Sequence, residues 1–108
     1  MILSEILPEK HSVELSIKYA TNDNFTGKPI YCRAGCYLHP KAEALLRKAV
    51  NLARNMSLTL KIYDAFRPSE AQWLLWNHTP DPNFLADPRR GSPHSKGAAI
   101  DLTLVDSN

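Results

Sequence analysis

A histidine and an aspartate stand seven positions apart in the last part of the chain, and both side chains are of types that bind metal ions. His94 lies in a stretch with loop character, Gly97 lets the chain turn, and Asp101 lies in a stretch with strand character. Histidine and aspartate are zinc ligands, and a strand is a rigid place to mount one. The bare spacing is a weak signal, because it equally suits a capping or surface histidine and a solvated aspartate.

Arg67 is a third candidate, at a junction between a strand-like and a helix-like segment. Its guanidinium stays protonated and offers a planar fork of donors, so it can stabilise negative charge that develops in a reaction. The alternative is an ordinary surface cation.

Two cysteines form a separate candidate cluster. Cys32 and Cys36 stand four positions apart, with His39 nearby. Only three zinc ligands are available there, so free thiols are favoured over a structural zinc site. A short-range disulfide is the remaining alternative, if the protein is exported.

Three regular elements are predicted to position these side chains. A helix of about 15 residues begins at Pro40, because apolar residues recur at helical spacing: Ala42, Leu45, Leu46, Ala49, Ala53 and Met56. A strand over 58–63 alternates apolar and polar residues and leads into Arg67. A second strand over 98–104 places Asp101 on the face opposite its apolar residues, Ala98, Ile100, Leu102 and Leu104.

Shorter elements are predicted on either side. Alternation at Val13, Leu15 and Ile17 indicates a strand, and the polar stretch 21–29 an ordered loop. Pro68 can open a second helix, which the prolines at 80 and 82 must end. The proline-rich segment 77–93 is then a long loop, and long loops inside compact domains are usually functional.

The composition is that of a single globular domain. The chain has 108 residues, 44% of them apolar and 22% charged, and a net charge of +2 with no clustered basic surface. A nucleic-acid-binding protein is therefore not indicated. The longest apolar run is the four residues 73–76, against the roughly 20 that cross a bilayer. The chain opens without a secretory signal, so a cytoplasmic protein is expected, with a processed periplasmic protein as the alternative.

Three separated stretches resemble the VanX-type D-alanyl-D-alanine dipeptidases, zinc peptidases related to the D-alanyl-D-alanine carboxypeptidases. They are Lys18-Tyr19-Ala20-Thr21 with Asp23-Asn24-Phe25-Thr26-Gly27-Lys28-Pro29, then Ile62-Tyr63-Asp64-Ala65-Phe66-Arg67-Pro68, then Ser92-x-His94 with Gly97-x-Ala99-Ile100-Asp101-Leu102-Thr103-Leu104. Any one would be modest evidence, but three in the family's order are not expected by chance. The resemblance implies an α+β fold, with helices packed on a central antiparallel sheet, and one catalytic zinc ion.

The resemblance also implies roles for five residues. His94 and Asp101 match two zinc ligands of the family, and Arg67 matches the arginine that stabilises the tetrahedral transition state. Ser92 and Tyr19 match residues that line the substrate pocket. The implied substrate is a small D,D-dipeptide, cleaved to two D-alanines in the removal of cell-wall precursors or the recycling of peptidoglycan, with neither nucleic acid nor membrane as a partner.

One element of the family pattern is missing from these 108 residues. The family's Glu-x-Trp-His element supplies a general base and a third zinc ligand, and the chain has no Trp-His dipeptide. The other histidines, His11, His39 and His78, precede His94 and are interpreted as surface or satisfied loop histidines. Two ligands hold zinc weakly, and loss of a general base removes a factor of about 10²–10⁴ in rate.

Three hypotheses follow. In the first, residues 1–108 are a partial dipeptidase domain, inactive alone, that lacks the Glu-x-Trp-His segment of a longer enzyme. In the second, the chain is a catalytically incomplete module that binds a small D,D-peptide or a protein partner. In the third, a second chain supplies the missing base and ligand. The first is favoured, because the chain carries only two of the three expected ligands.

Overall fold

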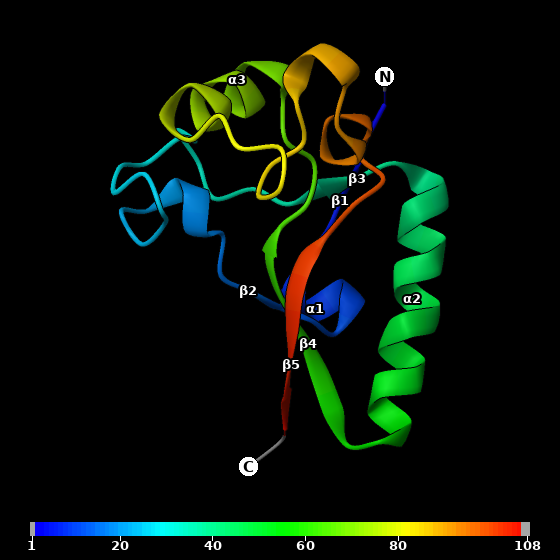
Figure 1. Cartoon of the computed structure of the whole chain (residues 1–108). Helices are drawn as coiled ribbons and strands as arrows, with labels where there is room; N and C mark the ends of the chain where they lie inside the picture. The colour runs from blue at the N-terminus through cyan, green and yellow to red at the C-terminus, as the bar shows by residue number, and fades with distance from the viewer. Residues whose placement is uncertain (1, 107–108) are drawn as a thin grey trace.

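A computed structural model describes residues 2–106 of the chain. The main elements, in order, are β1 (Ser4–Glu5), α1 (Pro8–His11), β2 (Glu14–Leu15), β3 (Tyr37–Leu38), α2 (Pro40–Asn55), β4 (Leu58–Asp64), α3 (Ser69–His78) and β5 (Asp101–Asp106) (Figure 1). Single 3₁₀ turns lie at Lys18–Ala20, Pro88–Arg90 and Pro93–Lys96. This mixture confirms the predicted α+β class. Within residues 2–106, every helix is too short or too polar to traverse a lipid bilayer.

The central sheet has three strands in the order β2-β4-β5. β4 and β5 are antiparallel, as expected, but β2 runs parallel to β4, so the sheet is mixed. Parallel neighbours need a long crossover connection, and the segment between β2 and β4, which includes α2, provides it. β1 and β3, which were not predicted, form a separate antiparallel pair. The strand predicted around Val13–Ile17 forms ladder bonds only at Glu14–Leu15, although Val13 and Ile17 are both buried.

The core lies between α2 and the sheet. α2 spans 16 residues, close to the predicted length. Its buried residues Leu46, Val50 and Ala53 share one helix face and join the same apolar cluster as Leu60 and Ile62 of β4. Two residues assigned to the apolar stripe, Leu45 and Met56, are exposed instead. Only one side of α2 packs against the sheet, so part of the predicted stripe has no neighbour to cover it.

β5 differs most from its prediction. It begins at Asp101 rather than at residue 98, because the Ala98 N–H bonds to the Pro93 carbonyl and not to a strand. Leu102 and Leu104 pair with Ile62 and Leu60, and residues paired across a ladder share a face. Leu102 and Leu104 are nevertheless 42% and 47% exposed, respectively. β5 is at the edge of the described sheet, and α2 packs against β4.

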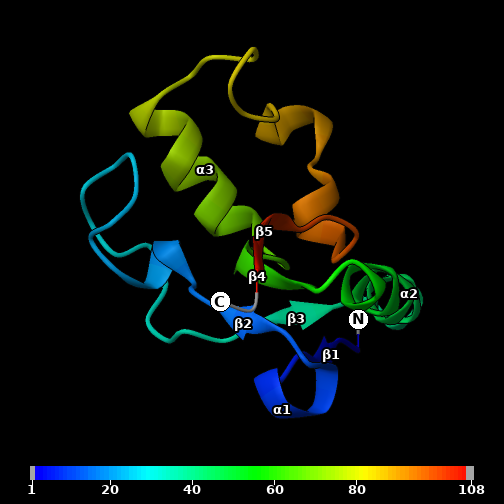
Figure 2. The ribbon, with the colours of Figure 1, turned by 90° about the horizontal axis from the view of Figure 1, so that it is seen from below.

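α3 lies at the end of the β4–β5 pair where β4 finishes and β5 starts (Figure 1). Pro68 precedes its first turn, and its buried face is formed by Ala71, Gln72 and Leu75. The segment after α3, rich in prolines as predicted, contains two of the 3₁₀ turns and gathers beside α3 at this same end (Figures 1 and 2). Strand ends, α3 and the long segment therefore enclose one region of the molecule.

Candidate active site

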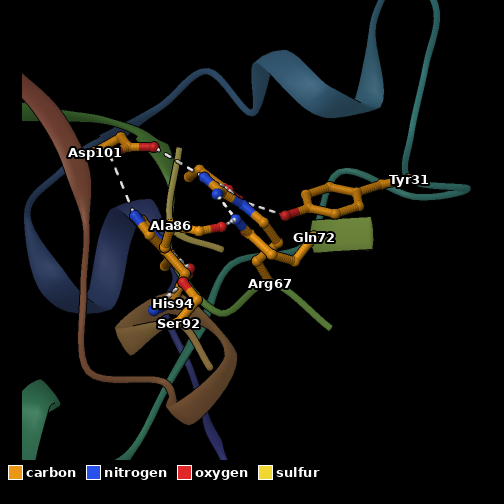
Figure 3. Close-up of polar contacts among 9 residues, drawn as sticks. Tyr31, Arg67, Gln72, Ala86, Ser92, His94 and Asp101 are labelled. Atoms are coloured by element: carbon orange, nitrogen blue, oxygen red, sulfur yellow. Dashed lines mark hydrogen bonds and ion pairs between the residues drawn. The ribbon is translucent and has the colours of Figure 1, made fainter. Parts of the chain in front are cut away.

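A bulge between β4 and β5 places two aspartates opposite each other. Ile62 pairs with Leu102, and Asp64 pairs with the neighbouring residue of β5, Asp101. The pairing thus advances by two residues along β4 but by only one along β5. A bulge of this kind bends a strand and re-aims its side chains. Asp101, predicted as a strand aspartate, is the first residue of β5. Its carboxylate meets both Arg67 and His94 (Figure 3).

His94 is held by the 3₁₀ turn Pro93–Lys96, and its ring orientation is fixed by a backbone oxygen. The Ala65 carbonyl accepts a hydrogen bond from Nδ1 at 2.8 Å, so the neutral ring carries its lone pair on Nε2. Nε2 lies 3.3 Å from Oδ1 of Asp101. Burial alone would lower the pKa of His94, but the Asp101 carboxylate and the Ala65 carbonyl raise it overall. His94 therefore presents Nε2 to the same space as Asp101.

Arg67 is a buried cation at the centre of the group. Its Nε and Nη2 donate to Oδ2 of Asp64 at 2.9 and 2.8 Å, and Nη2 also donates to Oδ2 of Asp101 at 3.1 Å. Nη1 donates to Oε1 of Gln72 at 2.8 Å. Burial alone would lower the pKa of the guanidinium, yet the Asp64 carboxylate raises it overall. The surface-cation alternative is thus excluded, because Arg67 is only 4% exposed.

Sequence reasoning missed three supporting residues: Asp64, Tyr31 and Gln72. Asp64 is buried, and its Oδ1 accepts a hydrogen bond from the Tyr31 hydroxyl at 2.8 Å. Burial raises the pKa of Asp64, and the guanidinium of Arg67 opposes that rise. The spacing of Asp64 and Arg67, three residues apart at the end of a strand, was an available signal for this ion pair. Tyr31 and Gln72 come from distant or helical positions that gave no such signal.

All five residues predicted for the site line one cavity of about 260 Å³. They are Tyr19, Arg67, Ser92, His94 and Asp101, and the remaining wall comes from Phe84, Leu85, Ala86 and Pro93 of the long segment. All four of these remaining wall residues belong to the stretch predicted to be a functional loop. A larger hollow of about 440 Å³, lined mainly by residues 30–37 and α3, contains none of the five.

The two predicted pocket residues contact the site differently. The Tyr19 ring lies 5.1 Å from the Arg67 guanidinium carbon, within the range of a cation–π contact. Ser92 is buried, and its hydroxyl accepts a hydrogen bond from the His94 N–H at 3.2 Å. Ser92 thus caps the turn that carries His94. Their contacts with a substrate stay predictions.

Asp64, His94 and Asp101 form the one group among residues 2–106 whose ligand atoms are close enough to hold a metal ion together, all within 4.8 Å. Asp64 is poorly suited to the role, because both of its buried oxygens are engaged by Arg67 and Tyr31. Asp101 is half-exposed, and its Oδ1 faces Nε2 of His94. Of the three groups, Nε2 of His94 and Oδ1 of Asp101 are thus the atoms still available to a metal ion.

The other histidines and the cysteines lie outside this group. His11 is buried against Glu43 at 2.6 Å, and His39 caps α2 by accepting the Lys41 N–H. His78 ends α3 and contacts Thr79. Cys32 and Cys36 are free thiols, one exposed and one buried.

Comparison with known proteins places the chain among peptidases. Residues 3–108 match the peptidase family M15, described as D-ala-D-ala dipeptidase. The chain is 47% identical over 106 residues to the D-alanyl-D-alanine dipeptidase of Escherichia coli K12, covering 98% of this chain and 53% of that protein. It is 36% identical over 117 residues to the enzyme of that name from Enterococcus faecium, covering 87% and 56%. It thus spans about half the length of the curated relatives it matches. Since the family match extends over nearly all of its residues, the chain belongs to the D-ala-D-ala dipeptidase family of peptidases.

Proposed function

We propose that the protein carrying this chain hydrolyses D-alanyl-D-alanine to two D-alanines with one zinc ion, and that this chain supplies two zinc ligands and the transition-state arginine. The observation that carries the proposal is that Tyr19, Arg67, Ser92, His94 and Asp101, which come from three separated stretches of the sequence, line one small cavity. Family membership supports the peptidase chemistry.

The two accessible ligands suit zinc. Two ligands on a tetrahedral zinc ion, with bonds of about 2.0–2.2 Å, are about 3.3–3.5 Å apart. Nε2 of His94 and Oδ1 of Asp101 are 3.3 Å apart. The Ala65 carbonyl supplies the outer hydrogen bond that zinc-binding histidines usually have. Bound zinc would lower the pKa of a water to about 7 and so supply a nucleophile at neutral pH.

Other residues of this chain stabilise the transition state and shape the substrate pocket. Arg67 donates hydrogen bonds toward the oxyanion that develops on the scissile carbonyl, and its ion pair with Asp64 keeps the buried guanidinium in place. Tyr19, Ser92 and the wall at Phe84–Ala86 shape a cavity of a size suited to a dipeptide. We propose that a Glu-x-Trp-His element, in the half of the relatives' length that this chain does not span, supplies the third ligand and the general base.

Metal and activity measurements on the protein expressed from its full coding sequence test this function. We expect D-alanine release from the dipeptide, its loss with a chelator and its return with zinc. His94→Ala should lose both bound zinc and activity, whereas His78→Ala, the same change at a histidine outside the cavity, should keep both. A folded, zinc-loaded protein that does not cleave the dipeptide would refute the proposal. Binding of the dipeptide without cleavage would favour the binding-module hypothesis.

Activity that appears only on mixing with a second chain would instead support the two-chain hypothesis. Cell fractionation of the full-length protein distinguishes the cytoplasm from the periplasm as its compartment.

A further inference from the structure

Gln72 is a buried amide on the inward face of α3, with an exposure of only 1%. Both polar atoms of its side chain form hydrogen bonds. Oε1 accepts a hydrogen bond from Nη1 of Arg67 at 2.8 Å, and Nε2 donates one to the Ala86 carbonyl at 2.7 Å (Figure 3). Burial of a polar group is costly unless it is hydrogen-bonded, and here both polar atoms have partners. Gln72 therefore joins Arg67 to the segment that follows α3.

On the Arg67 side, Gln72 holds the part of the guanidinium that the carboxylates leave free. Asp64 contacts Nε and Nη2, and Asp101 contacts Nη2. Gln72 is the partner of Nη1. The guanidinium group of Arg67 is thus held on two sides, by Asp64 and by Gln72. It cannot rotate about its ion pair with Asp64 without breaking the hydrogen bond to Gln72.

On the other side, Gln72 holds the wall of the cavity. Phe84, Leu85 and Ala86 line the same cavity as Arg67. Leu85 is buried, while Phe84 is exposed. The bond from Gln72 to the Ala86 carbonyl is a direct polar link from this wall to α3. Gln72 thereby sets the separation between the wall and the guanidinium.

We propose that Gln72 is a positioning residue that fixes Arg67 and the Phe84–Ala86 wall relative to each other, and this inference rests on the proposed peptidase function. The role requires a side chain with an acceptor at one atom and a donor at the other, which a primary amide has. Glutamate keeps an acceptor for Arg67 but has no proton for the Ala86 carbonyl. Methionine has a similar shape and makes neither bond.

Kinetics of two variants in the full-length protein test the role. Gln72→Met should lower kcat about 10- to 100-fold, the scale expected when a reacting group is misplaced by about an ångström, with zinc content unchanged. Gln72→Glu should lower kcat less than Gln72→Met does and should raise KM, because it loses only the hydrogen bond to the Ala86 carbonyl in the cavity wall. Glu70→Met, the same new side chain at an exposed position of α3, should match wild type. A Gln72→Met kcat within threefold of wild type would overturn the proposal.

A double variant separates positioning from general damage to the fold. If Gln72 acts through Arg67, then adding Gln72→Met to Arg67→Ala should change kcat by less than about twofold. A full additional loss in that background would show that Gln72 acts independently of Arg67, and would overturn the proposal.

A third measurement does not depend on activity. Hydrogen exchange by NMR at the Arg67 Nε–H and at the Phe84 and Leu85 amides should quicken in Gln72→Met but not in Glu70→Met. Unchanged exchange at either place would overturn the positioning role. An inactive wild type that shows this coupling would refute the peptidase function alone.

Discussion

Gly97 stands between His94 and Asp101, and replacing it with alanine tests whether the link between these two proposed zinc ligands has room for a side chain. Gly97 has φ of +70° and caps the turn that carries His94. A Cβ at this position would lie 2.8 Å from the backbone nitrogen of His39 and 3.0 Å from Cδ2 of Leu3. The first contact is with backbone at the start of α2, which cannot rotate away as a side chain can.

The cost has two parts. A left-handed backbone costs a non-glycine residue roughly 1–2 kcal/mol, and overpacking a tight site adds about 1–3 kcal/mol. Gly97→Ala should therefore lower the free energy of unfolding by about 2–5 kcal/mol. Gly27 has nearly the same φ, +73°, with nothing within 4 Å of the added Cβ. Gly27→Ala should carry only the first part of the cost.

Urea unfolding of both variants measures the difference. Because the backbone shift would also displace His94 relative to Asp101, Gly97→Ala should weaken zinc binding at least about tenfold, on the scale of outer contacts to metal ligands, whereas Gly27→Ala should not. Equal destabilisation by the two variants, within about 0.5 kcal/mol, would show that the contact of the added Cβ with the backbone of His39 carries no energetic cost. That result would refute the reasoning.

Three further outcomes are expected. Glu43→Gln should destabilise the protein at pH 7 by about 1 kcal/mol, because the amide keeps an acceptor for the buried His11, which Glu43 bonds at 2.6 Å, but loses the charge of the carboxylate. That bond lowers the pKa of Glu43 in the folded protein. The difference in unfolding free energy between wild type and variant should therefore be fully present above the unfolded pKa of about 4.3 and shrink as the pH falls through the folded pKa. Unfolding measured across acid pH checks this, and a difference that does not change with pH would contradict it. Iodoacetamide at pH 8 should label Cys32 and spare Cys36, whose thiol pKa burial raises to about 12, and equal labelling by peptide mapping would contradict it. Arg67→Lys should retain zinc but lose about 10²–10³ in kcat, because an ammonium cannot make the fork of contacts; a loss under threefold would argue against the oxyanion role.

The fold was predictable where local pattern and packing agree. The helix from Pro40 has a strong apolar period and a proline at its first turn, and its length was predicted within about a residue. β5 was predicted in the right region but with the wrong start, since the bond from Ala98 to Pro93 is a turn contact that strand periodicity does not encode. β1 and β3 have two residues each, too few to produce a period.

The site was predictable in its principal residues and not in their supports. His94, Asp101 and Arg67 belong to stretches that resemble a known family, and the cavity contains all three. Gln72 lies in a helix whose buried face is otherwise apolar, and nothing in its local sequence shows that the Ala86 carbonyl will lie 2.7 Å away. Such contacts depend on how the segment after α3 returns to the helix, which is a property of the whole fold.

The pairing of Asp64 with Arg67 explains how Asp101 can serve two partners. Arg67 is buried and needs a counterion. Had Asp101 been its sole carboxylate, both oxygens of Asp101 would be drawn to the fork of the guanidinium. Asp64 instead takes Nε and Nη2, so Asp101 gives the arginine one contact through Oδ2, at 3.1 Å, and keeps Oδ1 toward His94. Asp64 thus acts as the counterion of the arginine, and its presence leaves Asp101 free for the zinc-ligand role proposed for it.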